Sequence, residues 1–457
     1  MSSLKDLASL IMIPSLVKDG RLDTVKPLGN SIIHPDATGN NDGTDGSTPA
    51  EGNFTFTRGS NLSATRVDAS QLIEKGRENV LLYSQDFSNT AWNKSNLSLT
   101  ANQTDPLGGT NAFLFTSTSA SNNLFVQSLS NQNKVCSIYA KAGNRSIFAI
   151  VNNTYGNGAT FNLSAETAVS SGQGSLAVIE DVGNGWFRCS VYFSLGTQFL
   201  LVLSDVNGNG YSNGDTISFF GSQMELGTIA TPYIETGATT AQAGILENTP
   251  RLDYSVGATC PSLLLEPSRT NIITQSEYFG SSAWIKTSIS VTPNSIASPD
   301  GYTNADLFTT NNPAGTVYRA YNNSTGGTNT TNTISAFFKY GNHPYAYITG
   351  DSAGQGKFGI FNIQTGVVTF TSTGYTSTIT NYGNGWYRCT LTGTMDSANN
   401  IQFGLASTES AYAGTSLPDG KTMYCWGAQR EYNASYPTSY IPTYGVSQTR
   451  ALDFCNK

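Results

Sequence analysis

The heptapeptide Gly-Asn-Gly-Trp-Phe-Arg-Cys at residues 183–189 returns at residues 383–389 as Gly-Asn-Gly-Trp-Tyr-Arg-Cys. Because Asn and Gly tolerate positive φ, the Asn-Gly pair predicts a tight hairpin turn that opens a strand. Residue types alternate after the turn, so Phe187 and Cys189 are expected on the face opposite Trp186. The second copy alternates in the same phase. The chain is therefore expected to contain two copies of one β domain.

Further matches extend the repeat on both sides of this turn. Residues 72–81 match residues 264–273, and residues 220–225 match residues 426–431. Each copy carries short alternating strands separated by Gly and Asn turns about every 8–12 residues, which is typical of a two-sheet sandwich. We therefore expect an all-β chain with two tandem β-sandwich domains of the jelly-roll type.

The repeat also sets the expected division of the chain. Similar segments at residues 250–254 and 449–454 follow the two copies, so both copies are expected to continue into an extended segment that pairs with a neighbour. The expected parts are an N-terminal anchor segment at residues 1–27, an extended loop with short strands at 28–77, a first jelly roll at 78–240, a β connector at 241–270, a second jelly roll at 271–446 and a C-terminal extended tail at 447–457.

The composition suits a rigid β protein with polar turns. Only 12% of the residues are charged, about half the usual share, whereas 38% are hydrophobic and 11% aromatic, so a core can be buried. The net charge of −7 disfavours nucleic acid and anionic membrane surfaces as partners, because both require clustered Lys and Arg. No apolar run is long enough to span a bilayer, so no membrane insertion is expected.

The six cysteines do not form the pattern of a disulfide framework. In the aligned copies Cys136 stands opposite Ile334, and Cys425 stands opposite Phe219. Cysteine therefore exchanges with large apolar residues, as a buried free thiol does. This pattern predicts folding in a reducing cytosol, and the N-terminus lacks the basic leader and cleavage site of a secretory signal.

The first residues predict a short amphipathic helix at residues 2–13, which Pro14 would end. Its apolar face would consist of Leu4, Leu7, Ala8 and Ile11. Because about ten residues are too few for an independently stable helix, this face needs a surface to pack on. Two interpretations stay open: the helix packs on its own first domain, or it anchors the chain in another subunit or a larger assembly.

Candidate metal-binding residues are few. The two histidines, His34 and His343, lack a spaced Cys, His or carboxylate partner, so no metal and no cofactor is expected. Residues 205–216 partly resemble a calcium loop. Thr216 stands where an EF-hand has glutamate, which favours a plain hairpin loop over a cation site.

Two glutamates are the candidate acid/base groups. Glu74 precedes Arg77 by three residues, and Glu266 precedes Arg269 in the same way. A glycosidase would need two carboxylates about 5–10 Å apart across a cleft, and the sequence shows no sign of such a pair. Ion pairs that fix a strand are the favoured interpretation, and no catalytic residue is assigned.

Trp186 with Arg188, and Trp386 with Arg388, fall on one face of each repeated strand. These four are the candidate carbohydrate-binding residues, because a sugar ring can stack on Trp while Arg donates to its hydroxyls. The alternative is a buried Trp beside an Arg that makes a cation–π contact. The same pattern in both copies favours this structural alternative.

Several motifs taken together point to a known group. They are the N-terminal Leu-Lys-Asp-Leu-Ala-Ser-Leu, the segments Phe-Thr-Phe-Thr-Arg and Ala-Thr-Arg-Val, the segment Glu-Pro-Ser-Arg-Thr-Asn at residues 266–271, and the closing Trp-Gly-Ala-Gln at residues 426–429. As a set, they resemble proteins with head spike fibre domains in tailed phages, including crAss-like and other phages of Bacteroidota. The resemblance covers nearly the whole chain, although Phe220 replaces the closing tryptophan in the first copy.

The resemblance implies a non-enzymatic virion structural protein with jelly rolls like those of carbohydrate-binding modules. It would be a head fibre or decoration protein, or a tail fibre, made in the cytoplasm of the host bacterium and displayed on the virion surface. Its partners would be capsid or tail proteins, further copies in a dimer or trimer, and host or mucosal glycans. The alternatives are a capsular polysaccharide depolymerase of the phage tail and a ligand-free structural spacer.

Overall fold

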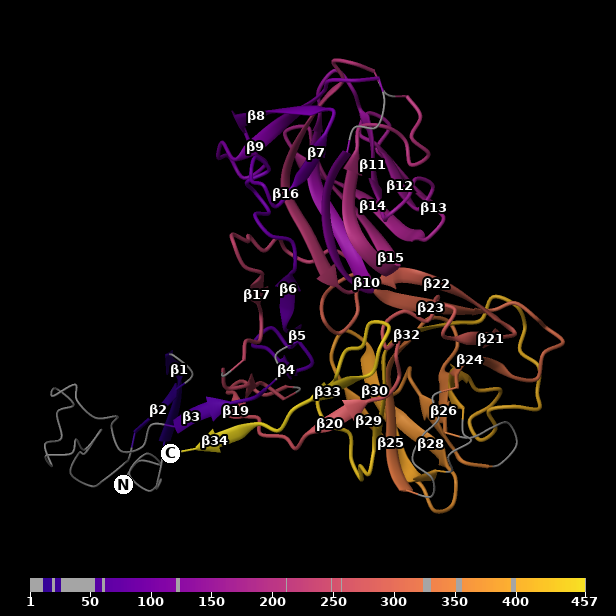
Figure 1. Cartoon of the computed structure of the whole chain (residues 1–457). Coiled ribbons are helices and arrows are strands. Elements are labelled where there is room, and N and C mark those ends of the chain that lie inside the picture. The colour runs from indigo at the N-terminus through magenta and orange to yellow at the C-terminus, as the bar shows by residue number, and fades with distance from the viewer. Residues whose placement is uncertain are drawn as a thin grey trace, which may run out of the picture.

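The computed structural model describes residues 11–18, 21–25, 54–59, 62–120, 124–210, 212–247, 249–255, 257–323, 330–350, 356–395 and 400–456. All regular elements in these ranges are strands, and most of them belong to two β-sandwiches (Figure 1). The all-β fold class with tandem sandwiches is therefore confirmed.

The first sandwich is one continuous ten-stranded antiparallel sheet that folds over on itself. Two long strands, β10 and β15, run through both of its layers, and their pairing shifts register between Ser128 and Lys134. Along the sheet the order is β13 (Thr167–Ser171), β12 (Gly158–Asn162), β11 (Ile147–Val151), β15 (Trp186–Val202), β10 (Leu124–Ala142), β16 (Thr216–Leu226), β9 (Ala112–Ser117) and β8 (Leu97–Gln103), with β14 (Gly174–Gly183) on β15 and β7 (Asn93–Ser95) on β10.

The second sandwich divides the same plan into two separate sheets, because shorter strands replace the two long ones. The inner sheet, which adjoins the rest of the chain, runs β22 (Ile289–Ile296), β23 (Ala305–Thr310), β32 (Thr422–Tyr432), β25 (Thr330–Tyr340), β30 (Trp386–Met395) and β29 (Thr376–Asn381), with β20 (Arg269–Asn271) and β33 (Gln448–Arg450) at β32. The outer sheet runs β21 (Ile285–Thr287), β24 (Tyr318–Asn322), β31 (Ile401–Leu405), β26 (Tyr345–Thr349), β27 (Phe358–Asn362) and β28 (Val367–Thr371).

The repeated heptapeptide forms the hairpin turn that the sequence predicts. Asn184 and Gly185 have φ values of 55° and 75°, and Asn384 and Gly385 have φ values of 51° and 79°. Both central residues of each turn are thus in the left-handed region, as a type I′ turn requires. The strand after the first turn places Cys189 in the core of its sandwich, and Cys389 has the same place in the second.

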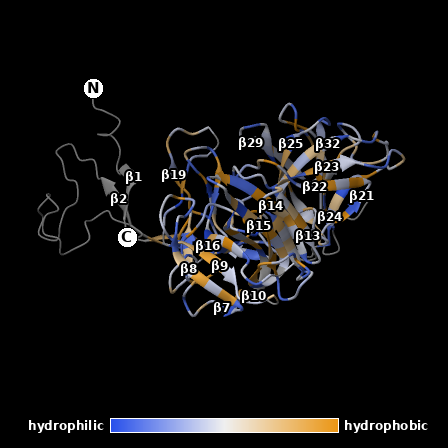
Figure 2. Cartoon of the chain, turned by 90° about the horizontal axis from the view of Figure 1, so that it is seen from above, coloured by the Kyte–Doolittle hydropathy of each residue, from blue (hydrophilic) through white to orange (hydrophobic). Residues whose placement is uncertain are grey.

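Each sandwich has its own hydrophobic core between its layers. Aromatic rings dominate both cores: Trp92 stacks on Phe125 at 4.4 Å in the first, and Trp284 lies 4.7 Å from Phe279 in the second. Figure 2 shows hydrophobic and hydrophilic residues interleaved along the strands, which is the alternation that buries one face of each sheet. All six cysteines are free, and Cys136, Cys189, Cys389 and Cys425 are buried.

A smaller four-stranded sheet lies to one side of the sandwiches (Figure 1). Its order is β1 (Ile11–Lys18), β2 (Arg21–Val25), β3 (Phe54–Thr57) and β34 (Phe454–Asn456). The strand β1 begins at Ile11, so the helix predicted from the sequence does not extend to Ile13. Pro14 is tolerated because β1 is an edge strand whose pairing is irregular between Met12 and Val17. Leu4, Leu7 and Ala8 lie outside the described residues.

Three short ladders link these parts. They are β4 (Thr65–Val67) with β5 (Ile73–Lys75), β6 (Arg77–Asn79) with β17 (Ala241–Ala243), and β18 (Leu252–Asp253) with β19 (Ser262–Leu263). The tail strand β33 pairs with β20, and β34 pairs with β3, so the end of the chain returns to both the second sandwich and the N-terminal sheet.

Candidate functional site

Motif residues that the two copies share are used to hold each sandwich together. The buried side-chain amide of Asn271 donates to the carbonyls of Ala428 and Ile441 at 3.0 and 2.9 Å. Its oxygen accepts from the backbone N–H of Ile273 and Arg430. Asn79 makes the equivalent four bonds in the first sandwich. Because these side chains satisfy buried backbone groups, we attribute their presence in both copies to stabilisation of the fold and not to ligand binding.

The candidate residues Trp186 and Trp386 lie beneath the surface, with 1% and 2% of their area exposed. The indole N–H of Trp386 donates to the carbonyl of Ala297 at 3.0 Å. Neither ring presents an open face to a sugar in this arrangement, because stacking requires an accessible ring. These two tryptophans therefore contribute to packing in the structure.

Their arginine neighbours are also engaged within the protein. The Arg188 guanidinium lies 5.4 Å from the ring centroid of Tyr139, and that of Arg388 lies 5.5 Å from the centroid of Phe337. Arg388 also donates to the carbonyl of Thr438 at 2.8 Å. The cation–π contacts that the sequence suggested are thus present, but their aromatic partners come from β10 and β25 rather than from the tryptophans.

Glu74 and Glu266 form ion pairs, although not with the arginines three residues later. Glu74 lies 2.6 Å from Arg66 on β4. Glu266 lies 2.8 Å from Arg251 and 3.0 Å from Arg450. The predicted pairs with Arg77 and Arg269 are therefore wrong in their partners: the β4–β5 ladder brings Arg66 to Glu74, whereas the connector and the tail bring Arg251 and Arg450 to Glu266.

The loop that partly resembles a calcium site is closed by its own carboxylate. Asp205 accepts hydrogen bonds from the backbone N–H of Asn207 and Asn209 at 2.9 and 2.8 Å, and from the Asn209 side chain at 3.1 Å. This is the geometry of a hairpin loop with an aspartate cap. Within the described residues, no three His, Cys, Asp or Glu side chains are grouped so that they could hold a metal ion.

The outer sheet of the second sandwich carries aromatic side chains on the face that points away from the core. On β26, Ala346 and Ile348 belong to the core, so Tyr345 and Tyr347 lie on the opposite face. Neighbouring strands and the loop after β31 add to this surface. We call it the aromatic face, and its side chains are Tyr321, Tyr345, Tyr347, Phe358, Ile360, Phe370 and Tyr412.

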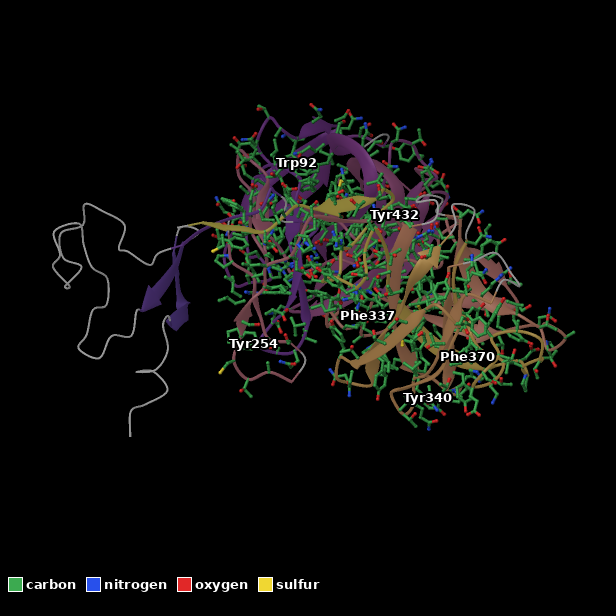
Figure 3. The ribbon with its side chains drawn as sticks, turned by 90° about the horizontal axis from the view of Figure 1, so that it is seen from below. Trp92, Tyr254, Phe337, Tyr340, Phe370 and Tyr432 are labelled. Carbon is green, nitrogen blue, oxygen red and sulfur yellow. The ribbon has the colours of Figure 1, made fainter. Side chains whose placement is uncertain are left out.

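The rings of the aromatic face contact one another in a continuous row. Phe358 stacks on Phe370 at 4.8 Å between centroids, and Tyr412 lies 4.7 Å from Phe358 and 4.9 Å from Tyr347. Tyr347 is fully buried beneath this row, whereas Phe358, Phe370 and Tyr412 remain partly exposed. Figure 3 labels Phe370 on the second sandwich.

Polar groups adjoin the rings on strand β24. Because Tyr318 and Ala320 belong to the core, Arg319 and Tyr321 lie on the aromatic face. The Arg319 guanidinium lies 4.7 Å from the centroid of the Tyr321 ring, and Arg319 Nη1 donates to Gln402 Oε1 at 2.6 Å. Gln402 is fully buried and holds Arg319 in place, and a planar donor beside aromatic rings can fix the orientation of a polar ligand in a largely apolar site.

The hydroxyl of Tyr347 lies beneath this surface. It is buried and has no hydrogen-bond partner among the described residues. Burial raises the pKa of Tyr347, so the phenol is neutral at physiological pH and can donate a proton to an acceptor. An unsatisfied buried hydroxyl is unfavourable, and this one lies beneath the row of rings, where a ligand on the surface does not reach it.

The first sandwich has a buried aliphatic cluster at the corresponding place. Ala149 and Val151 on β11 take the positions of Tyr347 and Thr349 on β26. They pack with further aliphatic side chains, which are Val126, Leu200, Val202 and Val206. The two copies therefore share their core and their hairpins but differ in the chemistry of this outer face.

Comparisons with known proteins add a weak likeness of fold. No family model matches the chain, and no curated protein matches it. Among solved structures, the chain is similar to the N-terminal CBM22-1-CBM22-2 tandem domain of Xyn10C from Paenibacillus barcinonensis, with 11% identity and a TM-score of 0.26. The match covers 82% of this chain and 99% of that one. At this TM-score the likeness supports no statement about function. No helix long and apolar enough to cross a bilayer occurs in the described parts of the chain.

Sequence reasoning missed the aromatic face because it looked for identities between the copies. The signal lies in a difference: Tyr345 and Tyr347 stand where the first copy has Ile147 and Ala149. Alternation on β26 already predicts that the two tyrosines share one face. Comparing the aligned strands for substitutions of aliphatic by aromatic residues would have identified the surface.

Proposed function

We propose that this chain is a non-enzymatic carbohydrate-binding protein whose second sandwich binds a glycan on the aromatic face. The single observation that supports it most strongly is the row of partly exposed rings at Phe358, Phe370 and Tyr412, where the described residues of the first sandwich have an aliphatic cluster instead. The C–H faces of a sugar ring pack on aromatic rings, and its hydroxyls accept hydrogen bonds from a donor such as Arg319.

The composition of the strands favours binding over hydrolysis. Glycoside hydrolysis needs a pair of carboxylates that flank the scissile bond. The five described strands β24, β26, β27, β28 and β31 contain no Asp or Glu. The charged side chain that they supply to the aromatic face is Arg319, which can donate to a hydroxyl or a carboxylate of a glycan.

A glycan array tests the proposal. The full chain should bind a limited set of glycans, and Tyr412→Ala should weaken that binding about tenfold or more, because an aromatic anchor at the centre of an interface contributes about 2 kcal/mol. Tyr155→Ala is the matched control, since Tyr155 is a partly exposed tyrosine on a loop of the first sandwich. Equal loss in both variants, or no binding by the full chain, would contradict the assignment. Release of reducing ends from a bound polysaccharide would favour a depolymerase instead.

The display role is part of the same proposal and is supported by the resemblance to phage head spike fibre proteins. The protein would be held on the virion by its N-terminal part and would project its sandwiches, as a dimer or trimer, toward surface glycans. The separate position of the four-stranded sheet in Figure 1 suits an attachment end. Removal of residues 1–25 should abolish incorporation into particles while the sandwiches stay folded. Normal incorporation of the truncated chain would refute the attachment role.

A further inference from the structure

A cavity lies where the two sandwiches meet, and it shares no residue with the aromatic face. It has a volume of about 240 Å³. Its walls come from the linking strands β5 and β6, from the segment after β16 at residues 226–231, and from the second sandwich at Glu277, Tyr302, Asn304, Pro442 and Tyr444. We call it the junction cavity. Neither sandwich forms it alone.

One wall of the junction cavity is held by a buried lysine. Lys75 Nζ lies 2.9 Å from Glu277 and 2.6 Å from Asp300, and 3.3 Å from the hydroxyl of Tyr444. Burial by itself would lower the pKa of Lys75, but the two carboxylates raise it well above its usual value, so the amine stays charged. These ion pairs therefore hold this wall of the cavity in place before a ligand binds.

Two polar residues of the wall have bonding capacity left. Asn304 is 1% exposed, and its amide nitrogen donates to Glu277 at 3.3 Å and to Asp300 at 3.1 Å. Because carboxylates only accept, this fixes the amide orientation and leaves Asn304 Oδ1 without a donor. Thr228 is 2% exposed, and its hydroxyl also lacks a partner among the described residues.

The charged side chains that line the junction cavity indicate what net charge a ligand carries. The charged side chains that line the cavity are Lys75, Arg77, Glu78 and Glu277. Each already has a protein partner: Arg77 donates to Thr231 at 3.0 Å, and Glu78 accepts from Thr240 at 2.7 Å. Because these are two cations and two anions, the lining has no net formal charge that would select a charged ligand, and a fully apolar ligand would leave Asn304 and Thr228 unsatisfied.

We infer that the junction cavity is a binding site for a small, neutral, polyhydroxylated molecule the size of one sugar ring. The apolar side chains Leu62, Val80, Leu226 and Ile229 offer packing for its C–H groups. Its hydroxyls supply the donor for Asn304 and the partner for Thr228. Sites for drug-sized ligands measure roughly 300–1,000 Å³, so this smaller volume selects a single ring rather than an oligosaccharide.

The test uses the full chain with D-glucose, D-galactose, L-rhamnose and glycerol as probes, each titrated by calorimetry and by ligand-observed NMR. At least one probe should bind saturably and raise the midpoint of thermal unfolding, because it binds only the folded state. Thr228→Val keeps the shape and removes the hydroxyl, and it should raise the Kd about fivefold. Ile229→Phe fills the cavity and should abolish binding.

The aromatic face gives the matched control, and the two sites can fail separately. Tyr412→Ala should leave binding of the small probe unchanged, and Ile229→Phe should leave glycan binding on an array unchanged. Saturable binding that persists in Ile229→Phe would overturn the inference, because the probe then binds elsewhere. Absence of binding by every probe would overturn it too, since the cavity then holds water only.

Discussion

The same substitution at one motif position should affect the two copies very differently. Glu74 and Glu266 are equivalent in the repeat. The Glu74 side chain is 28% exposed and pairs with Arg66, which is 26% exposed. The Glu266 side chain is 11% exposed, and the two arginines that it contacts, Arg251 and Arg450, are fully buried. Glutamine at either position keeps the size and removes the charge.

The magnitudes follow from these surroundings. An exposed ion pair contributes less than about 1 kcal/mol, so Glu74→Gln should lower the free energy of unfolding by no more than that. Removing one partner of a buried pair costs about 3–5 kcal/mol, because the remaining charge stays in the interior. Arg251 keeps Asp453 as a partner after the change, so we expect the lower end for Glu266→Gln, about 3 kcal/mol.

Urea titration followed by tryptophan fluorescence measures both variants. All five tryptophans are at most 2% exposed, so their emission reports loss of the buried state. The midpoint of Glu266→Gln should lie well below that of the wild type, and the midpoint of Glu74→Gln should almost coincide with it. Equal shifts in the two variants would refute the reasoning, because they would show that burial of the guanidinium groups does not set the cost.

The pH dependence of the free energy of unfolding tests the role of Glu266 independently. Burial by itself would raise the pKa of Glu266, but Arg450 and Arg251 outweigh it and hold the pKa below its usual value. The stabilisation is therefore present above the unfolded pKa of about 4.3 and is lost as the pH falls through the folded pKa. Wild type should lose stability in acid more steeply than Glu266→Gln. Parallel acid limbs would contradict the assigned role.

Two further predictions concern the sandwiches themselves. Burial lowers the pKa of His343, whose Nε2 pairs with the carbonyl of Ala406 at 2.8 Å, so the folded state holds a neutral ring. Stability should then fall as the pH drops below about 6.5, and His343→Gln should flatten that fall in urea titrations; an unchanged slope would count against it. Asn271→Ala should cost roughly 3 kcal/mol, because it removes four hydrogen bonds and leaves buried backbone groups unpaired. In calorimetry, Asn271→Ala should lower the unfolding temperature of the second sandwich, and Asn79→Ala should lower that of the first. A single transition that both variants lower would show that the sandwiches unfold together.

The local rules of the sequence predicted the architecture well. The alternation of polar and apolar residues and the Asn-Gly turns were sufficient to predict the hairpins, because a two-residue turn with positive φ fixes the register of the strands beside it. The exchange of Cys136 with Ile334 and of Cys425 with Phe219 indicated buried thiols, since all four side chains are buried in the two cores. Each of these inferences depends on neighbours in sequence or on the aligned copy.

The ion-pair partners could not be predicted in this way, because they depend on how distant segments meet. Arg251 and Glu266 are close in the chain, but Arg450 reaches the same carboxylate only because β33 pairs with β20. The end of the predicted N-terminal helix, at residues 11–13, was wrong for a related reason. Pairing of β1 with β2 satisfies the backbone from Ile11 onward, and tertiary pairing overrides a weak helical pattern.

The cluster around Glu266 joins the N-terminal sheet, the connector and the tail. Arg58 follows β3 of the N-terminal sheet and pairs with Asp453 of the tail at 3.3 Å. Asp453 also pairs with Arg251 of the connector, which in turn contacts Glu266 at the start of the second sandwich. These buried pairs tie the N-terminal sheet to both the connector and the tail. Ion pairs as well as the backbone therefore hold the N-terminal sheet in place relative to the sandwiches. Loss of Glu266 should loosen this attachment of the sheet before it unfolds either core.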